Sequence, residues 1–158
     1  MDRRQQIIVC LMTILFILSS CQIGSKDRLK TGEISDIPEL VVTIGEKSAT
    51  LEHGHYSIEK RKSGSMTIET TDVASPNQLA EQLTPIYAKS DKQVQIDVEG
   101  DPELNVYEWD YSGVISEITV SEQSFTLPGK DGTLILEVFA EWKNAEASYT
   151  FVVDINDE

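Results

Sequence analysis

Cysteine and basic residues are both scarce in this sequence. Only two cysteines occur, Cys10 and Cys21, so the chain beyond residue 21 has no thiol for a disulfide framework or a thiolate metal site. The 13 Lys and Arg side chains stand against 27 Asp and Glu, which gives a formal net charge of −14. Because binding to phosphate groups requires a basic surface, this balance excludes a nucleic-acid partner. The length of 158 residues fits one ordinary domain.

Catalytic sequence motifs are absent as well. The chain contains no Gly-x-Ser-x-Gly nucleophile elbow and no glycine-rich phosphate-binding loop. Its two histidines, His53 and His55, lie two residues apart rather than being dispersed into a base and an orienting residue. We therefore expect a protein that is not an enzyme. The alternative is a secreted hydrolase or inhibitor domain that uses paired carboxylates, since residues 93–158 are strongly acidic.

The first twenty residues have the pattern of a signal peptide. Two arginines precede an apolar run from Ile7 to Leu18, which is short for a membrane span. The run leads into Leu18-Ser19-Ser20-Cys21, an aliphatic residue, two small residues and a cysteine. This segment looks like a bacterial lipobox, in which the cysteine receives a diacylglycerol and becomes the mature N-terminus. The expected lipid attachment site is Cys21, and two acyl chains supply a stable membrane anchor.

Three segments follow from this interpretation. Residues 1–20 are the lipoprotein signal peptide, and residues 21–36 are the lipidated cysteine with a flexible tether, because this stretch is polar and lacks apolar periodicity. Residues 37–158 form one acidic domain. The predicted location is the extracytoplasmic face of the cell membrane, and the predicted partners are the membrane, through the lipid anchor, and a protein or envelope ligand that the sequence does not identify.

Alternation with a period of two residues dominates the chain from residue 39 onward and predicts half-buried strands. Between residues 134 and 155, two stretches with apolar side chains on one parity predict a closing hairpin. The inward side chains expected there are Leu134, Leu136, Val138, Ala140, Trp142, Tyr149, Phe151, Val153 and Ile155. Further strands are predicted over residues 40–44, 48–51, 55–60, 66–71, 94–98, 105–111, 115–120 and 124–127.

The predicted fold is an all-β, Ig-like antiparallel β-sandwich with one short connecting helix. The helix is expected after Ser75-Pro76, where a capping hydroxyl precedes a proline at the first helical position. Trp109 is expected as the central aromatic of the core. Alternatively, Tyr107, Trp109 and Tyr111 share one face of a strand and are free to stack on a sugar or a peptide. The competing parity directs Leu104 and Val106 inward, so the strand switches face or contains a bulge near Tyr107.

Two clusters contain residue types that bind metal ions. His53 and His55 would lie on one face of a strand, but two ligands are too few for zinc. The alternating acids Asp97, Glu99, Asp101 and Glu103 surround a Gly-Asp-Pro turn and offer oxygen ligands for Ca²⁺, as in a calcium-dependent adhesion module. They lack the ligand order of a known calcium loop. We therefore expect a solvated acidic face there and no cofactor.

Several segments together resemble small surface lipoproteins of Bacillus-type bacteria. Besides the lipobox and the polar tether, they are Gly54-His55-Tyr56-Ser57, Ala74-Ser75-Pro76, Tyr107-Glu108-Trp109-Asp110, the run from Gly132 to Trp142, and Ala147-Ser148-Tyr149-Thr150-Phe151. The resemblance implies a surface-anchored β domain without an assigned activity. Our expectation is a monomeric, non-enzymatic module for binding or for interaction with the cell envelope.

Overall fold

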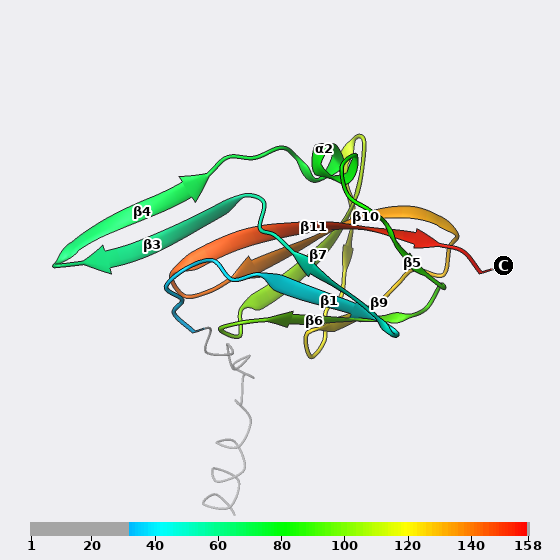
Figure 1. Cartoon of the computed structure of the whole chain (residues 1–158), viewed down its shortest axis with the longest axis horizontal. Coiled ribbons are helices and arrows are strands. Elements are labelled where there is room, and N and C mark those ends of the chain that lie inside the picture. Colours follow the sequence, from blue (N-terminus) through cyan, green and yellow to red (C-terminus); the bar gives the residue numbers. More distant parts are fainter. Residues whose placement is uncertain (1–31, 158) are drawn as a thin grey trace, which may run out of the picture.

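Strands arranged in two sheets make up most of the structure, a computed structural model that describes residues 32–157 (Figure 1). All strand pairs but one are antiparallel, and the two sheets enclose a common apolar core. The predicted all-β sandwich is therefore confirmed. The lipid attachment expected at Cys21 lies outside the described residues. Within them, no helix combines the length and the apolar character needed to cross a bilayer.

The smaller sheet, sheet A, contains four strands. Their spatial order is β2 (Lys47–Leu51), β1 (Leu40–Ile44), β6 (Gln93–Val98) and β9 (Ser124–Thr126). In β6, buried valine and isoleucine side chains alternate with exposed polar ones, as the sequence predicts. Sheet A therefore has one face in the core and one face in water.

The larger sheet, sheet B, has seven strands and carries the longest ladder. Residues in β10 pair with residues in β11 over the whole of β10, and both strands lie inside the sheet. The spatial order is β4 (Ser65–Thr71), β3 (Tyr56–Lys62), β11 (Ala145–Ile155), β10 (Gly132–Glu141), β7 (Glu103–Asp110) and β8 (Gly113–Ile118), with β5 (Ile86–Ala88) paired in parallel to β11.

The core forms where the inner faces of the two sheets meet. The predicted phase of β10 and β11 is confirmed, because every one of the nine side chains expected to point inward is buried. Tyr149 is fully buried, and its hydroxyl donates a hydrogen bond of 2.7 Å to the carbonyl oxygen of Pro38. Burial raises the pKa of the Tyr149 phenol, so the side chain stays neutral in the folded protein.

Strand β11 is buried on both faces, which its alternating sequence does not indicate. Ser148 and Thr150 point away from sheet A and are nevertheless buried. On this side of sheet B the short helix α2 (Pro76–Ala80) contacts β10 and β11 (Figure 1), and Gly54 is hydrogen-bonded to Ser148. The predicted helix is confirmed, and Ser75 donates its backbone N–H to the side chain of Gln78 across the first turn.

The expectation for Trp109 is wrong. Its side chain is only partly buried and its indole N–H donates a 2.8 Å hydrogen bond to the carboxylate of Glu137, whereas Val106 and Glu108 are buried on the inner face of β7. A register shift between Glu108 and Trp109 interrupts the pairing of β7 with β8. The bulge of the alternative parity is thus present, and the central aromatic side chain of the core is Tyr149 instead.

Candidate functional site

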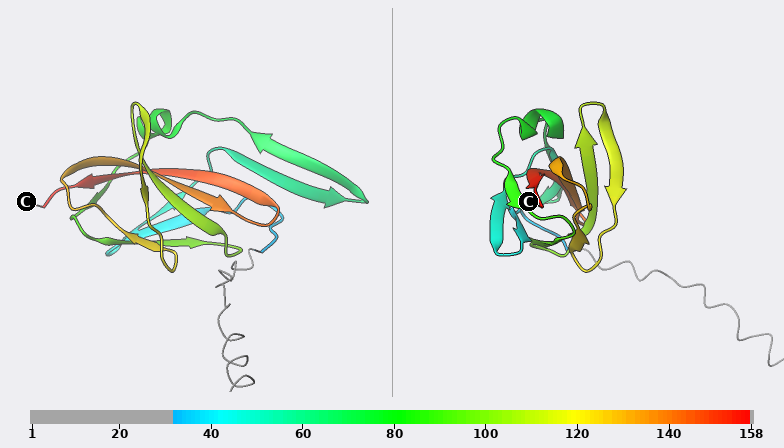
Figure 2. Two further views of the ribbon diagram at one scale, coloured as in Figure 1. Left: turned by 180° about the vertical axis from the view of Figure 1, so that it is seen from behind. Right: turned by 90° about the vertical axis from the view of Figure 1, so that its right-hand side faces the viewer.

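A hairpin formed by β3 and β4 projects beyond the body of the sandwich (Figures 1 and 2). Strand β3 pairs with β11 only through Tyr56, Ser57 and Ile58. Beyond these residues β3 pairs with β4 alone, and every residue from Arg61 to Thr70 is exposed. This hairpin is the part of the described chain that extends furthest from the core.

The sequence explains why the hairpin leaves the body. Apolar alternation in β3 ends at Ile58, and Glu-Lys-Arg-Lys follows, which offers no side chain for burial. The turn is formed by Ser63 and Gly64, which have φ angles of 50° and 85°. Positive φ at both central residues is typical of a type I′ turn, whose twist matches that of the flanking strands. The result is a regular two-stranded ribbon without a bulge.

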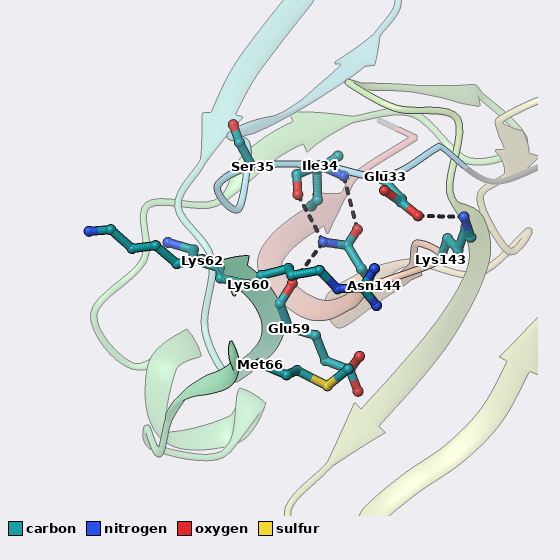
Figure 3. Close-up of a pocket in the computed structure, with 10 residues that line it drawn as sticks. Glu33, Ile34, Ser35, Glu59, Lys60, Lys62, Met66, Lys143 and Asn144 are labelled. Carbon is teal, nitrogen blue, oxygen red and sulfur yellow. Dashed lines mark hydrogen bonds and ion pairs between the residues drawn. The ribbon is translucent and has the colours of Figure 1, made fainter. Parts of the chain in front are cut away.

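A groove of about 730 Å³ lies at the base of this hairpin (Figure 3). Three parts of the chain form its walls: the N-terminal segment, the hairpin, and the turn between β10 and β11. We refer to it as the hairpin groove. Its lining residues are Glu33, Ile34, Ser35, Glu59, Lys60, Arg61, Lys62, Met66, Lys143 and Asn144.

Asn144 holds the three walls together. Its side-chain oxygen accepts the backbone N–H of Ile34 at 2.9 Å, and its amide nitrogen donates to the carbonyl oxygens of Ile34 at 2.9 Å and Glu59 at 3.1 Å (Figure 3). The carbonyl oxygen of Asn144 also accepts the backbone N–H of Glu59 at 2.8 Å. One side chain therefore joins segments that are separated by up to 110 residues.

The N-terminal segment is bonded to the body next to this groove. Gly32 donates its backbone N–H to the carbonyl oxygen of Gly100 at 2.9 Å and accepts the N–H of Lys143 at 3.3 Å. Ile34 packs against the core cluster. The last five residues of the stretch expected as a flexible tether thus begin the ordered domain.

Ion pairs organise the charges around the groove. Lys60 lies 2.9 Å from both Asp36 and Glu69, and these hydrogen bonds raise the pKa of its ammonium group. Lys143 is paired with Glu33, and this hydrogen bond lowers the pKa of the Glu33 carboxyl. All three of these ion pairs are open to solvent, so each contributes little to stability.

Two further cations in the groove lining, Arg61 and Lys62, form no ion pair with any residue between 32 and 157. Both are exposed. They are the basic side chains best placed to meet an anionic or hydrogen-bond-accepting group entering the groove. Of the two carboxylates in the lining, Glu33 is already bonded to Lys143.

A second, smaller hollow lies at the other end of the sandwich. Its volume is about 390 Å³, and it is lined in part by Lys47, Tyr87, Lys89 and Lys92. The ammonium of Lys47 donates to the carbonyl oxygen of Tyr87 at 2.6 Å and lies 5.8 Å from the centre of its ring. Tyr87 itself is exposed, so this hollow is a shallow surface feature.

The histidines are used locally. The His53 ring lies edge-on to Tyr56, with ring centres 4.8 Å apart, and Nδ1 of His55 is hydrogen-bonded to the carbonyl oxygen of Thr71 at 2.8 Å. The residues around them do not form a strand, so the shared face expected for both rings is not formed. Within residues 32–157, no three His, Cys, Asp or Glu side chains are grouped closely enough to hold a metal ion.

The acidic turn also stays open to water. Asp97, Glu99, Asp101 and Glu103 are all exposed, on the outer side of β6 and at the start of β7. Asp101 accepts a long hydrogen bond of 3.4 Å from the side chain of Gln123. The structure does not bring the four carboxylates together around one point.

Sequence patterns did not reveal the hairpin groove. The loss of apolar alternation after Ile58 was a usable signal that β3 leaves the body. The role of Asn144 had no such signal, because its hydrogen bonds join residues far apart in the chain. Comparison of the chain with protein-family models, with curated proteins and with solved structures finds no match.

Proposed function

We propose that this chain is an extracytoplasmic lipoprotein, anchored to the cell membrane through Cys21, whose Ig-like β-sandwich serves as a non-enzymatic binding or envelope-interaction module. The observation that carries the proposal is the projecting β3–β4 hairpin with the groove at its base. An exposed ribbon that adds nothing to the core is available for contact with something outside the domain.

The position of the N-terminal segment fits an anchored module. Residues 22–31 separate the expected lipid from Gly32, so only ten residues join the anchor to the described domain. Gly32 is bonded to Gly100 and Lys143 beside the hairpin groove. The anchor would therefore hold this end of the sandwich near the membrane surface and leave the opposite end, with the C-terminus, pointing away (Figure 1).

The geometry of the groove favours binding over chemistry. Its walls are backbone segments and long polar side chains, open to water, and its carboxylate Glu33 is bonded to Lys143. Arg61 and Lys62 supply hydrogen-bond donors at the rim. Such a site suits an extended ligand with acceptor groups that lies along the hairpin.

The anchor is tested by replacing the expected attachment residue in the full-length chain. Cys21→Ser should abolish incorporation of labelled fatty acid and release the protein from the membrane fraction. Cys10→Ser is the matched control, because this cysteine lies in the apolar run and is removed with the signal peptide; its label should persist. Fatty-acid labelling that survives in Cys21→Ser would overturn the lipoprotein assignment.

The binding role is tested by charge removal at the rim. Arg61→Ala with Lys62→Ala should reduce capture of envelope components by the intact protein, since these cations have no ion pair within the described residues. Lys89→Ala with Lys92→Ala, at the other end of the sandwich, is the control. Equal capture by both double variants would show that the hairpin groove is not the binding site.

A further inference from the structure

The outer edge of the hairpin is an unpaired strand edge. Strand β4 has seven residues, pairs only with β3, and keeps a regular register from Ser65 to Thr71. An edge of this kind presents a row of free backbone N–H and C=O groups, which can pair with another strand.

The other terminal strands of the two sheets are protected against such pairing. Strand β9 has only three residues, β2 begins with Lys47, and β8 carries Glu117 and follows a bulge in its partner strand. Strand β4 contains no proline and no lysine. Its one charge, Glu69, is neutralised within the hairpin by Lys60 at 2.9 Å.

The hairpin beyond Ile58 also lacks the support that a sheet normally has. A two-stranded ribbon with both faces in water is marginally stable, whereas a third strand stabilises it. Two of its side chains, Met66 and Ile68, are apolar and are 56% and 62% exposed. A further strand alongside β4 would cover part of both.

The turn determines which backbone groups are free. In a hairpin closed by a two-residue turn, Lys62 and Ser65 form the hydrogen-bonded pair next to the turn. Because hydrogen-bonded pairs alternate along an antiparallel ladder, Thr67 and Glu69 direct their backbone groups toward β3. Met66 and Ile68 then direct their N–H and C=O groups outward, toward the free edge.

We propose that β4 pairs with β4 of a second copy of this chain, antiparallel and around a two-fold axis at Thr67. In this register Met66 of each copy lies opposite Ile68 of the other copy, and both pairs are on the same face of the sheet. The outward backbone groups of these residues form hydrogen bonds between the two copies. The four strands make one continuous sheet, β3-β4-β4-β3. The same strand supplies both halves of the interface, as a two-fold interface requires.

Charge also favours a second copy at this position. The hairpin from Tyr56 to Thr71 has three basic and two acidic side chains, whereas the whole chain carries a formal charge of −14. Two acidic domains repel each other unless they meet through their least acidic parts. Contact between projecting hairpins keeps the two bodies apart. The proposal departs from the monomer expected from the sequence, and it does not depend on lipid attachment at Cys21.

A cysteine on the proposed axis tests the pairing directly. Thr67 would face Thr67 of the second copy in a non-hydrogen-bonded pair, with Cα atoms about 4.5 Å apart, a distance that a disulfide spans. Thr67→Cys in the full-length chain should therefore give a disulfide-linked dimer on mild oxidation in cells. Thr50→Cys is the matched control, because Thr50 is an exposed threonine on the edge strand β2, and the unmodified chain controls for Cys10 and Cys21.

A proline at Ile68 separates edge pairing from folding. Ile68→Pro removes an outward N–H and leaves the ladder with β3 intact, so the Thr67→Cys dimer should fall at least tenfold while the melting temperature changes little. An absent dimer in Thr67→Cys alone, or an undiminished dimer with Ile68→Pro, would overturn the proposal. A cross-link from residue 67 to a different protein would overturn the second copy as the occupant of the edge.

Discussion

The indole N–H of Trp142 donates a hydrogen bond of 2.8 Å to the backbone carbonyl oxygen of Glu99. Trp142 follows β10 in sheet B, and Glu99 follows β6 in sheet A, so this bond closes one end of the sandwich. The ring itself is 5% exposed and belongs to the core cluster. One side chain therefore joins the two sheets through both burial and a hydrogen bond.

Removing this ring should be costly. Trp142→Ala is expected to lower the free energy of unfolding by about 3–5 kcal/mol, because a large buried aromatic is lost and a cavity remains. Trp142→Phe keeps most of the apolar contact, loses only the bond to Glu99, and should cost about 1–2 kcal/mol. Urea unfolding followed by circular dichroism measures both. A loss below about 1 kcal/mol for Trp142→Ala would contradict the packing described here.

Substitutions at two glycines with positive φ distinguish the cost of backbone strain from the cost of steric crowding. Gly100 has a φ angle of 87° and Gly45 a φ angle of 62°. A Cβ atom added at Gly100 would lie 2.8 Å from Ile34 and 2.9 Å from Trp142. A Cβ atom added at Gly45 would meet no atom within 4 Å. Gly45→Ala should cost about 1–2 kcal/mol from strain alone. Gly100→Ala should cost clearly more, because the N-terminal segment must shift. Equal losses in thermal unfolding would show that this segment is not packed there.

The carboxylate of Glu108 is buried on the inner face of β7 and lies 2.6 Å from the ammonium of Lys130. Lys130→Met should destabilise the protein by about 1–3 kcal/mol, since it leaves a buried charge without its partner. Adding Glu108→Gln to Lys130→Met should recover much of the loss. A double-mutant cycle measured by chemical denaturation gives the coupling, and simple additivity would mean that the pair is not coupled.

Glu137 links stability to pH. Burial raises the pKa of this carboxyl above its ordinary value of 4.5, against the opposing effect of the hydrogen bonds from Trp109 and Ser148. The folded state therefore favours the protonated carboxyl, and its contribution to stability is lost as the pH rises through the raised pKa. Glu137→Gln should unfold at a higher denaturant concentration than the unmodified protein at pH 7, and this gain should vanish near pH 4. A gain that does not vary with pH would contradict the assignment.

Calcium should have no specific effect. The exposed carboxylates from Asp97 to Glu103 do not converge, so millimolar CaCl₂ should raise the melting temperature no more than NaCl at matched ionic strength. A ligand that bound only the folded state would stabilise it by about 2.7 kcal/mol at a hundredfold excess over its dissociation constant. A calcium-specific rise of several degrees, lost in Asp97→Asn with Asp101→Asn, would restore the calcium site.

The sequence predicts those parts of the fold in which local alternation determines burial. The phase from Leu134 to Trp142 is readable because one face of β10 packs in the core. The prediction that Trp109 lies in the core was wrong because a large apolar side chain suggests burial, whereas the polar Glu108 takes the inner position with Lys130 as its partner. Ser148 and Thr150 are buried although their parity points away from sheet A, and Ser148 is hydrogen-bonded to Gly54 and His55 from a distant part of the chain.

The candidate site was even less predictable. Strands were predicted over residues 55–60 and 66–71, and the structure pairs them as β3 and β4 around the Ser63-Gly64 turn. The groove at their base depends on Asn144, which lies 110 residues after Ile34. Periodicity reports which side of a strand is buried and contains no information about such distant partners.

The order of strands in sheet B has a consequence for biosynthesis. The last strand to be made, β11, lies inside the sheet, between β10 on one edge and β3 and β5 on the other. Strands β3 and β5 lack their partner β11 until it has been made, whereas β1, β2 and β6 pair with one another in sheet A. The core, to which β11 contributes Tyr149 and Phe151, is therefore completed only in the last stage of synthesis.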